Sequence, residues 1–229
     1  MLFPTDFDQP EDPKPRLQLL PYHPIDWPVR NALKMHVPVN PPEAGFSSVL
    51  ESRRSIRAIS RAPLRETVNL LLYAHVQRFS WGDKPRRSMR PTHSAGALHP
   101  VELLLVAGHH RNRVFRIEPV DIALQSLRIV NPKPLISLGA KLIEILPNAR
   151  SDYIVLLADR SLTASQYSSA RNLIWRDAGA LMQTLHLCAT AFRMAFCPVG
   201  IGGAELGDAV FGPDHRFEAV GVAILGRPV

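Results

Sequence analysis

Apolar positions along this chain follow two kinds of pattern, helical spacing and short continuous runs. Phe46, Val49 and Leu50 recur at i, i+3 and i+4, which predicts a helix that ends at RRSIR (53–57). Residues 64–79 carry a longer apolar stripe behind a proline and predict a second helix. Further helices are predicted over 134–146, 168–195 and 204–212. The 168–195 segment is apolar on most faces, so we expect it in the interior or at a subunit interface.

Strands are predicted where short runs are apolar throughout or alternate, at 102–108, 113–119, 152–160 and 217–225. The HHRN sequence between the first two indicates a hairpin turn. Residues 80–100 are polar and contain several glycines and prolines, which predicts a long loop of the kind that is often functional. Helices and strands in separate blocks favour an α+β fold.

Residues 1–42 contain ten prolines, a density that prevents long helices. We expect this segment to form an extended N-terminal arm and residues 43–229 to form the folded domain. Apolar side chains such as Leu19, Tyr22 and Trp27 indicate that the arm packs on something. Two alternatives stay open here, an arm that wraps a partner subunit and a partly mobile tail.

Composition is that of an ordinary globular protein, with 46% apolar and 21% charged residues. A net charge of +7 is typical of nucleic-acid binders, but no zinc-finger spacing, RNP-type motif or basic heptad accompanies it. We therefore expect no nucleic-acid partner. The arginines gather in clusters, which suit a small anion or an acidic peptide.

The start of the chain lacks the pattern of a signal peptide, and no run of ~18 consecutive apolar residues occurs. These features predict a cytoplasmic protein that does not interact with membranes. Cys188 and Cys197 form no CxxC pair, so we expect two reduced core thiols and no metal site.

The first segment with candidate chemistry is RRSIR. Arg53, Ser55 and Arg57 alternate, so an extended backbone would turn two guanidiniums and a hydroxyl to one side. Bidentate charged donors with one short neutral donor suit a phosphate group. A solvated basic helix end is the plain alternative.

Two further segments offer donors near the backbone. In RPTHSAGALHP (90–100), Thr92, His93 and Ser94 supply short polar groups, and the small residues around Gly96 let a planar polar ligand approach closely. CPVGIGG (197–203) offers free amides near an apolar pocket, without the spacing of a Rossmann fingerprint. A loop before a strand and a helix C-cap turn also explain these two segments.

Taken together and in this order, the three segments resemble those of the nitroreductase superfamily, in particular its SagB-type dehydrogenase branch. RRSIR is similar to the branch's RRSxR start, and RPTHSAGALHPVE to its R-x-x-P-S-x-G-x-x-x-P-x-E segment. WRDAGALMQTLHLCATAFRMAFCPVGIGG is similar to its long central helix and the turn that follows. The resemblance runs from about Gly45 to Gly226.

The resemblance implies a nitroreductase-like fold with a central antiparallel sheet packed by helices. It also implies an intertwined homodimer that binds FMN at the subunit interface. By position, Arg53, Ser55 and Arg57 would hold the phosphate and ribityl chain, and Thr92, Ser94 and Gly96 would lie along the ring edge. The remaining implied contacts are those of Pro198, Gly200 and Ile201 with the ring face, of Gln183 with the ring or ribityl chain, and of Arg227 with the phosphate.

Two departures from the branch affect catalysis. His93 stands where the branch usually has proline, and it could act on a substrate or serve as a structural donor. Gln166–Tyr167 stands where azoline dehydrogenases of the branch typically have a Lys-Tyr pair for proton transfer. Glutamine cannot act as a general base, which leaves Tyr167 as the candidate acid/base group, with a surface tyrosine as the alternative.

Three functions are compatible with these residues. The first is oxidation of an azoline ring, or a related bond, in a ribosomally made peptide by hydride transfer to the flavin. The enzyme would then work with a cyclodehydratase partner, and Arg87 and Arg90 would help to bind an acidic leader peptide. The second is NAD(P)H-dependent reduction of nitro, quinone or enone compounds. The third is a catalytically silent scaffold subunit of a peptide-modifying complex.

Overall fold

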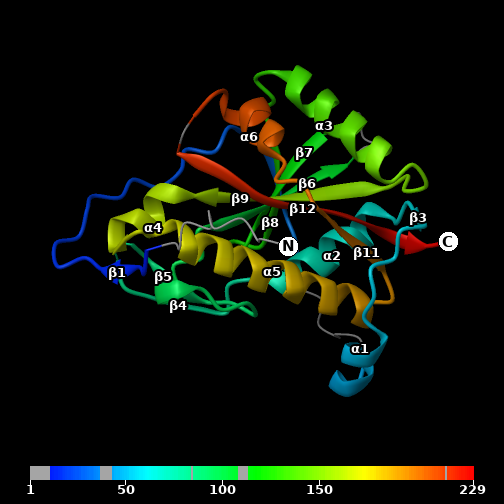
Figure 1. Cartoon of the computed structure of the whole chain (residues 1–229), viewed down its shortest axis with the longest axis horizontal. Helices are drawn as coiled ribbons and strands as arrows, with labels where there is room; N and C mark the ends of the chain where they lie inside the picture. Colours follow the sequence, from blue (N-terminus) through cyan, green and yellow to red (C-terminus); the bar gives the residue numbers. More distant parts are fainter. Residues whose placement is uncertain (1–10, 37–42, 84, 108–112, 215) are drawn as a thin grey trace, which may run out of the picture.

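At the centre of the fold lies one antiparallel sheet, shown in Figure 1. The computed structural model describes residues 11–36, 43–83, 85–107, 113–214 and 216–229. In spatial order the main strands are β11 (Ala195–Val199), β12 (Phe217–Pro228), β9 (Asp152–Asp159), β6 (Val101–Ala107), β7 (Arg113–Glu118), β8 (Ala123–Leu127) and β2 (Val29–Lys34). The short β3 (Ile59–Ser60) pairs with the end of β12. This architecture confirms the predicted α+β class with a central antiparallel sheet.

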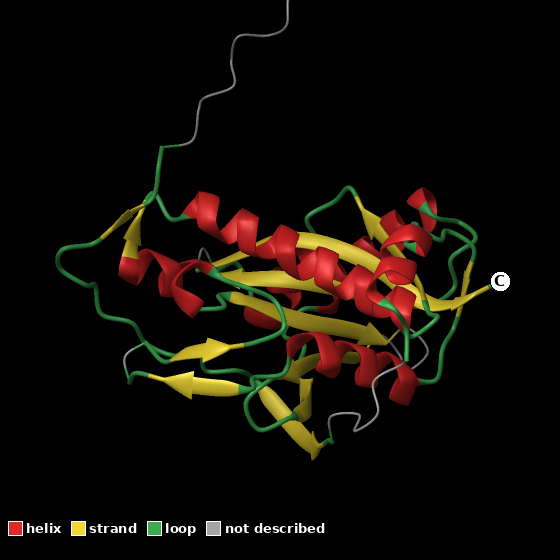
Figure 2. Ribbon diagram, turned by 90° about the horizontal axis from the view of Figure 1, so that it is seen from below, coloured by secondary structure: helices red, strands yellow, loops and turns green. Residues whose placement is uncertain are grey.

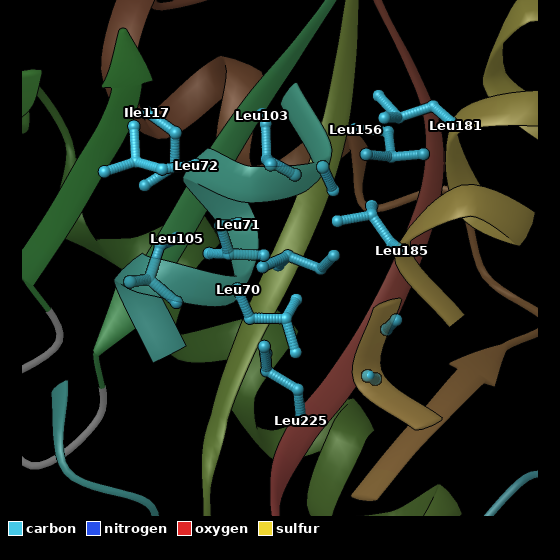
Figure 3. Close-up of a cluster of buried hydrophobic side chains, with 14 of the residues drawn as sticks. Leu70, Leu71, Leu72, Leu103, Leu105, Ile117, Leu156, Leu181, Leu185 and Leu225 are labelled. Carbon is cyan, nitrogen blue, oxygen red and sulfur yellow. The ribbon is translucent and has the colours of Figure 1, made fainter. Parts of the chain in front are cut away.

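Helices cover both faces of the sheet. On one face lie α2 (Leu64–His75) and α5 (Arg171–Ala191), and on the other lie α3 (Pro132–Ile145) and α6 (Ala204–Phe211). Alternate side chains of β6 enter opposite cores, because successive residues of a strand point to opposite faces. Leu103 and Leu105 join the core under α2 and α5, while Leu104 joins the other. Figure 3 shows the first core, where leucines of α2, α5 and the strands meet.

Smaller elements lie around the ends of α5. Helix α1 (Phe46–Ser52) projects from the body near the C-terminal end of α5 (Figure 1). Four smaller features lie near the N-terminal end of α5. They are α4 (Arg160–Gln166), the hairpin of β4 (Phe79–Trp81) and β5 (Arg87–Met89), the 3-10 turn η1 (Ala95–Ala97), and the pair of β1 (Lys14–Pro15) with β10 (Tyr167–Ser168). Figure 2 shows α5 extending along most of the length of the sheet.

Several predicted boundaries were wrong. The helix predicted over 64–79 ends at His75, and the predicted loop 80–100 contains the β4–β5 hairpin. The 168–195 helix spans Arg171–Ala191, and part of the predicted turn that follows is the strand β11. Arg193 reverses the chain here with φ of 55°, without the glycine that usually marks a helix end. The predicted hairpin turn at 109–112 lies outside the described residues.

The described part of the N-terminal arm, residues 11–36, lies against its own chain. β2 pairs with β8 at the sheet edge, and Trp27 packs against Phe211 and Phe217 with ring centroids 5.2 and 6.5 Å away. Arg216 anchors the arm further back, because it binds Asp159 at 2.7 and 3.0 Å and the carbonyl oxygen of His23 at 2.7 Å. Arm and domain therefore share one packed structure over these residues.

Both cysteines are free thiols, Cys188 half-buried and Cys197 buried, as expected. Burial raises the pKa of the Cys188 thiol to about 11, which keeps it protonated and unreactive near neutrality. None of the helices in the described ranges is long and apolar enough to cross a membrane.

Gly226 tests the packing where β12 passes β3, and Gly139 in α3 serves as the control. A methyl group on the buried Gly226 would collide with the carbonyl oxygen of Ser60 and with Ser151 Oγ, whereas one on Gly139 in α3 would meet no atom within 4 Å. We expect Gly226→Ala to lower the free energy of unfolding by about 1–3 kcal/mol, as overpacking does. Gly139→Ala should raise it by about 0.5–1 kcal/mol, because alanine is the better helix former. Urea unfolding of both variants measures the difference, and equal stability of the two would contradict this packing.

Candidate functional site

The predicted motifs gather at the two ends of α5. His186, in the C-terminal half of this helix, donates from Nε2 to the carbonyl oxygen of Arg54 at 3.1 Å. Asp177, in the N-terminal half, binds the segment that contains Ser94. The two positions are nine residues apart, which at ~1.5 Å per residue separates them by roughly 13 Å along the axis. The motif residues therefore form two separate groups along α5, which we call the two half-sites.

RRSIR forms the first half-site, directly after α1. Its backbone leaves the helix at Arg53, where ψ is 119°, and the amide of Ile56 donates to the carbonyl oxygen of Phe196 at 3.2 Å. Within the described residues, the side chains of Arg53, Ser55 and Arg57 make no hydrogen bond or ion pair. All three are at least partly exposed. Two unpaired guanidiniums and a hydroxyl are thus available to an anion.

Arg53 and Arg57 lie close enough to α5 and β11 for their charges to shift the pKa of one residue in each element. Burial lowers the pKa of His186, and the charge of Arg53 lowers it further. Burial raises the pKa of Cys197, while the charge of Arg57 acts in the opposite direction. Cys197 is followed immediately by Pro198, so the first motif lies beside the strand that leads into the third.

The third motif begins in the last residues of β11 and continues into the turn that follows the strand. Pro198 and Gly200 are exposed and Ile201 is half-exposed. A methyl group on Gly200 would meet nothing within 4 Å, and Gly200 does not have positive φ, so nothing in the described chain requires glycine there. Gly203 differs, because it has φ of 86° and lies against Val222 and Val155. The turn is therefore packed against the sheet at Gly203, whereas no atom of the described chain covers the position of a side chain at Gly200.

Arg227 lies near the first motif but has a partner. It pairs with Ser60 of β3, and its guanidinium binds the Glu66 carboxylate at 2.5 and 3.2 Å. This ion pair is largely exposed, and such pairs contribute little to stability. Arg227 could therefore exchange Glu66 for an anionic ligand at small cost.

Asp177 holds the second motif on the other half of α5. Its carboxylate accepts from Ser94 Oγ at 2.5 Å and from the amide of Ala95 at 3.1 Å. Burial raises the pKa of Asp177, and these two hydrogen bonds oppose the rise. Asp177 is part of the helix motif, but no role was predicted for it. The sequence feature that could have indicated one is a single carboxylate among buried apolar positions, because a buried ionised group needs hydrogen-bond partners.

Beneath this motif lies a small buried polar cluster. Arg90 donates to His75 Nε2 at 3.2 Å and to Ser88 Oγ at 3.3 Å, and His99 Nε2 donates to the carbonyl oxygen of Ser88 at 2.9 Å. Thr92 lies inward here, with its hydroxyl buried and without a partner beside a cavity of about 10 Å³. Thr92 therefore faces the interior of its own chain, while His93 is exposed.

Tyr167 lies against the second motif. A methyl group on Gly96 would meet Tyr167 Oη at 2.8 Å and Arg87 Nη1 at 2.9 Å, and Gly96 itself has φ of 59°. Both the space and the backbone conformation therefore require glycine. Tyr167 belongs to β10 and not to a helix start, and Gln166 before it is buried. The structure thus brings Gly96, Gln166 and Tyr167 together.

Gln183 is exposed on the outer face of α5, away from the sheet. It lies between the two half-sites along the helix, three residues before His186 and six after Asp177. Trp175 and Gly179 are also exposed on this helix, and a methyl group on Gly179 would meet no atom. The outer face of α5 is therefore open to close approach.

A cavity of about 1180 Å³ opens beside the N-terminal half of α5. The arm, α4 and the first turns of α5 form its walls, with Ile174 and Trp175 as apolar lining and Arg160, Arg171 and Arg216 as basic lining. Glu218 fixes part of this wall, since it accepts from Arg171 Nε at 2.9 Å and from Trp175 Nε1 at 3.2 Å. The volume exceeds the ~300–1,000 Å³ typical of small-molecule pockets.

Known structures share this fold. A candidate nitroreductase from Ralstonia eutropha matches with a TM-score of 0.63 and 15% identity, covering 96% of this chain and 99% of its own. A candidate nitroreductase from Desulfovibrio desulfuricans, solved in complex with FMN, matches at 0.54 and 19%, covering 82% and 88%. A chain of the Escherichia coli microcin synthetase McbBCD complex, solved with truncated pro-MccB17 bound, matches at 0.59 and 16%, covering 87% and 79%.

No protein-family model and no curated protein matches the sequence. The fold is thus the nitroreductase-like fold expected from the three motifs.

His99 makes stability pH-dependent at the second motif. Burial and the nearby Arg90 lower the pKa of His99 to about 4, against an ordinary value of 6.5. The folded state thus favours neutral His99, and this stabilisation is complete above pH 6.5 and is lost as the pH falls through 4. We expect the free energy of unfolding to fall by up to about 1.4 kcal/mol per pH unit over this range.

His99→Gln keeps a donor for the Ser88 carbonyl but cannot gain a proton, so its stability should fall less steeply. Chemical denaturation at pH 7, 5.5 and 4 compares the two slopes. Identical slopes for the variant and the wild type would show that His99 does not control this dependence.

Proposed function

We propose that this protein is an FMN-dependent oxidoreductase, and that its first and third motifs hold the cofactor. The observation that carries the proposal is the pair of unpaired guanidiniums at Arg53 and Arg57 beside β11, the strand that leads into the open turn at Gly200. Charge-assisted donors suit a phosphate. Neither the packing nor the backbone conformation of this chain requires glycine at position 200, and a residue without a side chain there would let a flat ring lie against the backbone. A flavin phosphate and its isoalloxazine ring need this combination.

We further propose that two copies of the chain complete each site. The second motif, with Ser94, Gly96 and Tyr167, lies at the opposite end of α5 from Arg57. Two copies packed antiparallel along α5 would bring the half-sites together. In support, α1 projects from the body with Phe46 71% exposed, and Trp175 is 46% exposed on the outer face of α5. Leu50, one turn after Phe46 on α1, is also 47% exposed, and neighbouring exposed apolar side chains of this kind are typical of subunit interfaces.

Bound FMN supplies the hydride acceptor or donor, and the residues of this chain orient it and move protons. Arg53, Ser55 and Arg57 bind the phosphate end, and Pro198, Gly200 and Ile201 contact the ring face. Ser94 and Gly96, fixed by Asp177, lie along the ring edge from the partner. Tyr167 is the proton-transfer group, because its hydroxyl lies at the edge of this half-site, and His93 is the second candidate because it is exposed there.

The reaction that we favour is oxidation of an azoline ring in a ribosomally made peptide. Two observations support a peptide substrate. The cavity beside the N-terminal half of α5 exceeds the size of a small-molecule pocket, and one structure of the same fold belongs to a microcin synthetase complex. A cyclodehydratase would supply the azoline. Arg87 and Arg90 cannot bind the leader peptide as they stand, because both point inward, and the basic lining at Arg171 is the better candidate.

Reduction of nitro, quinone or enone compounds with NAD(P)H is the second candidate, since two relatives of the same fold carry the nitroreductase name. Turnover with NADPH and menadione, without turnover of a synthetic thiazoline peptide, would favour it. A catalytically silent scaffold would show neither reaction and would co-purify with a cyclodehydratase without flavin.

Loss of one clamp arginine should weaken FMN binding. We expect Arg57→Gln and Arg53→Gln to raise the dissociation constant about 10–100-fold, as loss of a charged hydrogen bond does. Arg54→Gln is the matched control, because Arg54 is exposed and contributes its carbonyl oxygen to His186. Quenching of FMN fluorescence measures the constants. Equal effects of all three variants would mean general charge attraction and would contradict a clamp.

Complementation tests the shared site. Arg57→Gln damages one half-site and Asp177→Asn the other, so each variant alone should bind little FMN. In a re-equilibrated 1:1 mixture of the two, about a quarter of the sites should regain wild-type affinity, because half of the dimers are mixed and each has one intact site. If mixing restores no binding, the two half-sites do not combine across subunits.

A further inference from the structure

Arg87 differs from its neighbour Arg86 in where its guanidinium lies. Arg86 is exposed at the tip of the β4–β5 hairpin and donates to Ser80 Oγ at 2.6 and 2.9 Å. Arg87 is half-buried and turns inward, toward the second motif and β10. Arg87 and Arg90 were both expected to bind an acidic peptide, so the inward position of Arg87 calls for a different role.

The guanidinium of Arg87 bridges two segments that are distant in sequence. Nη1 donates to the carbonyl oxygen of Gly96, and Nη2 donates to Gln166 Oε1 at 3.2 Å. Gln166 is buried and is itself held in place. Its side-chain Nε2 donates to Ser165 Oγ at 3.2 Å, and its main-chain carbonyl oxygen accepts from the amide of Arg16 at 2.8 Å. One rigid fork therefore ties the ring-edge motif to the residue before Tyr167.

Tyr167 completes this arrangement. Its hydroxyl and Arg87 Nη1 both lie within 3 Å of the point where a side chain of residue 96 would begin. Because Gly96 has no side chain, there is room for both the phenol and the guanidinium beside it. The hydroxyl of Tyr167 therefore lies next to the segment that Arg87 binds.

We propose that Arg87 is the positioning residue that holds the Tyr167 hydroxyl at the edge of the flavin half-site. This inference rests on the proposed function, in which Tyr167 transfers the proton. Arginine stays protonated and cannot accept the proton itself. Lysine cannot replace it, because a single ammonium group does not span two acceptors as a planar fork does.

Amide hydrogen exchange of the full-length protein without FMN tests the bridge directly. The amides of Ala97, Leu98 and Tyr167 donate to Ser94, Ala95 and Thr163, inside the two bridged segments. Arg87→Lys and Arg87→Gln should speed exchange at these three amides about tenfold and leave the β6–β9 ladder unchanged. Arg86→Gln is the matched control and should change none of them. Unchanged exchange in both Arg87 variants overturns the bridge.

A double-mutant cycle separates positioning from general support. With FMN and a synthetic peptide that contains one thiazoline, Arg87→Lys should lower kcat about 10–100-fold at nearly constant KM. In a Tyr167→Phe background the same substitution should lower kcat less than twofold, because the group that it positions is gone. Equal losses in both backgrounds overturn the positioning role. If the wild type does not oxidise the peptide, the proposed reaction fails, and the exchange experiment still decides the role of Arg87.

Discussion

The length and position of α5 constrain every part of the candidate site. This helix of 21 residues packs through Leu181 and Leu185 onto the sheet, and its two halves hold different motifs. Asp177 fixes Ser94 and Ala95 at one end, and His186 donates a hydrogen bond to the carbonyl oxygen of Arg54 at the other. Because an α-helix is rigid over this length, it keeps the two half-sites apart within one chain. In the proposed dimer, a second copy would bring complementary half-sites together, with α5 at the interface.

Buried polar contacts give the second half-site its precision. Asp177, Arg87 and His99 each place a charged or titratable side chain under the loop, and each contacts the main chain of its neighbours. Main-chain contacts fix the backbone of the loop and leave outer side chains such as His93 exposed. The cost is that three ionisable groups are partly desolvated, and burial shifts the pKa of Asp177 upward and that of His99 downward. Functional sites commonly carry such perturbed groups.

The fold was predictable where periodicity is strong. The apolar stripe of α2, the continuous run of β6 and the motif order sufficed for the α+β class and the nitroreductase-like fold. The strand β11 was not predicted, because its apolar residues directly continue those of α5 and the chain reverses at Arg193 without a glycine. The inward positions of Arg87 and Thr92 were also not predicted. A polar side chain in a loop is buried only by contacts from distant segments, which local sequence does not indicate. Gln166, which stands where the branch typically has lysine, is a buried acceptor for Arg87, and this contact was not predicted.

Native mass spectrometry of the full-length protein, after reconstitution with FMN and removal of excess cofactor, tests the central claim most directly. One spectrum reports both the number of chains and the number of flavins. The composite site predicts a species of two chains with two FMN molecules, and no FMN on any single chain. Single chains that retain FMN, or dimers that carry none, would contradict it.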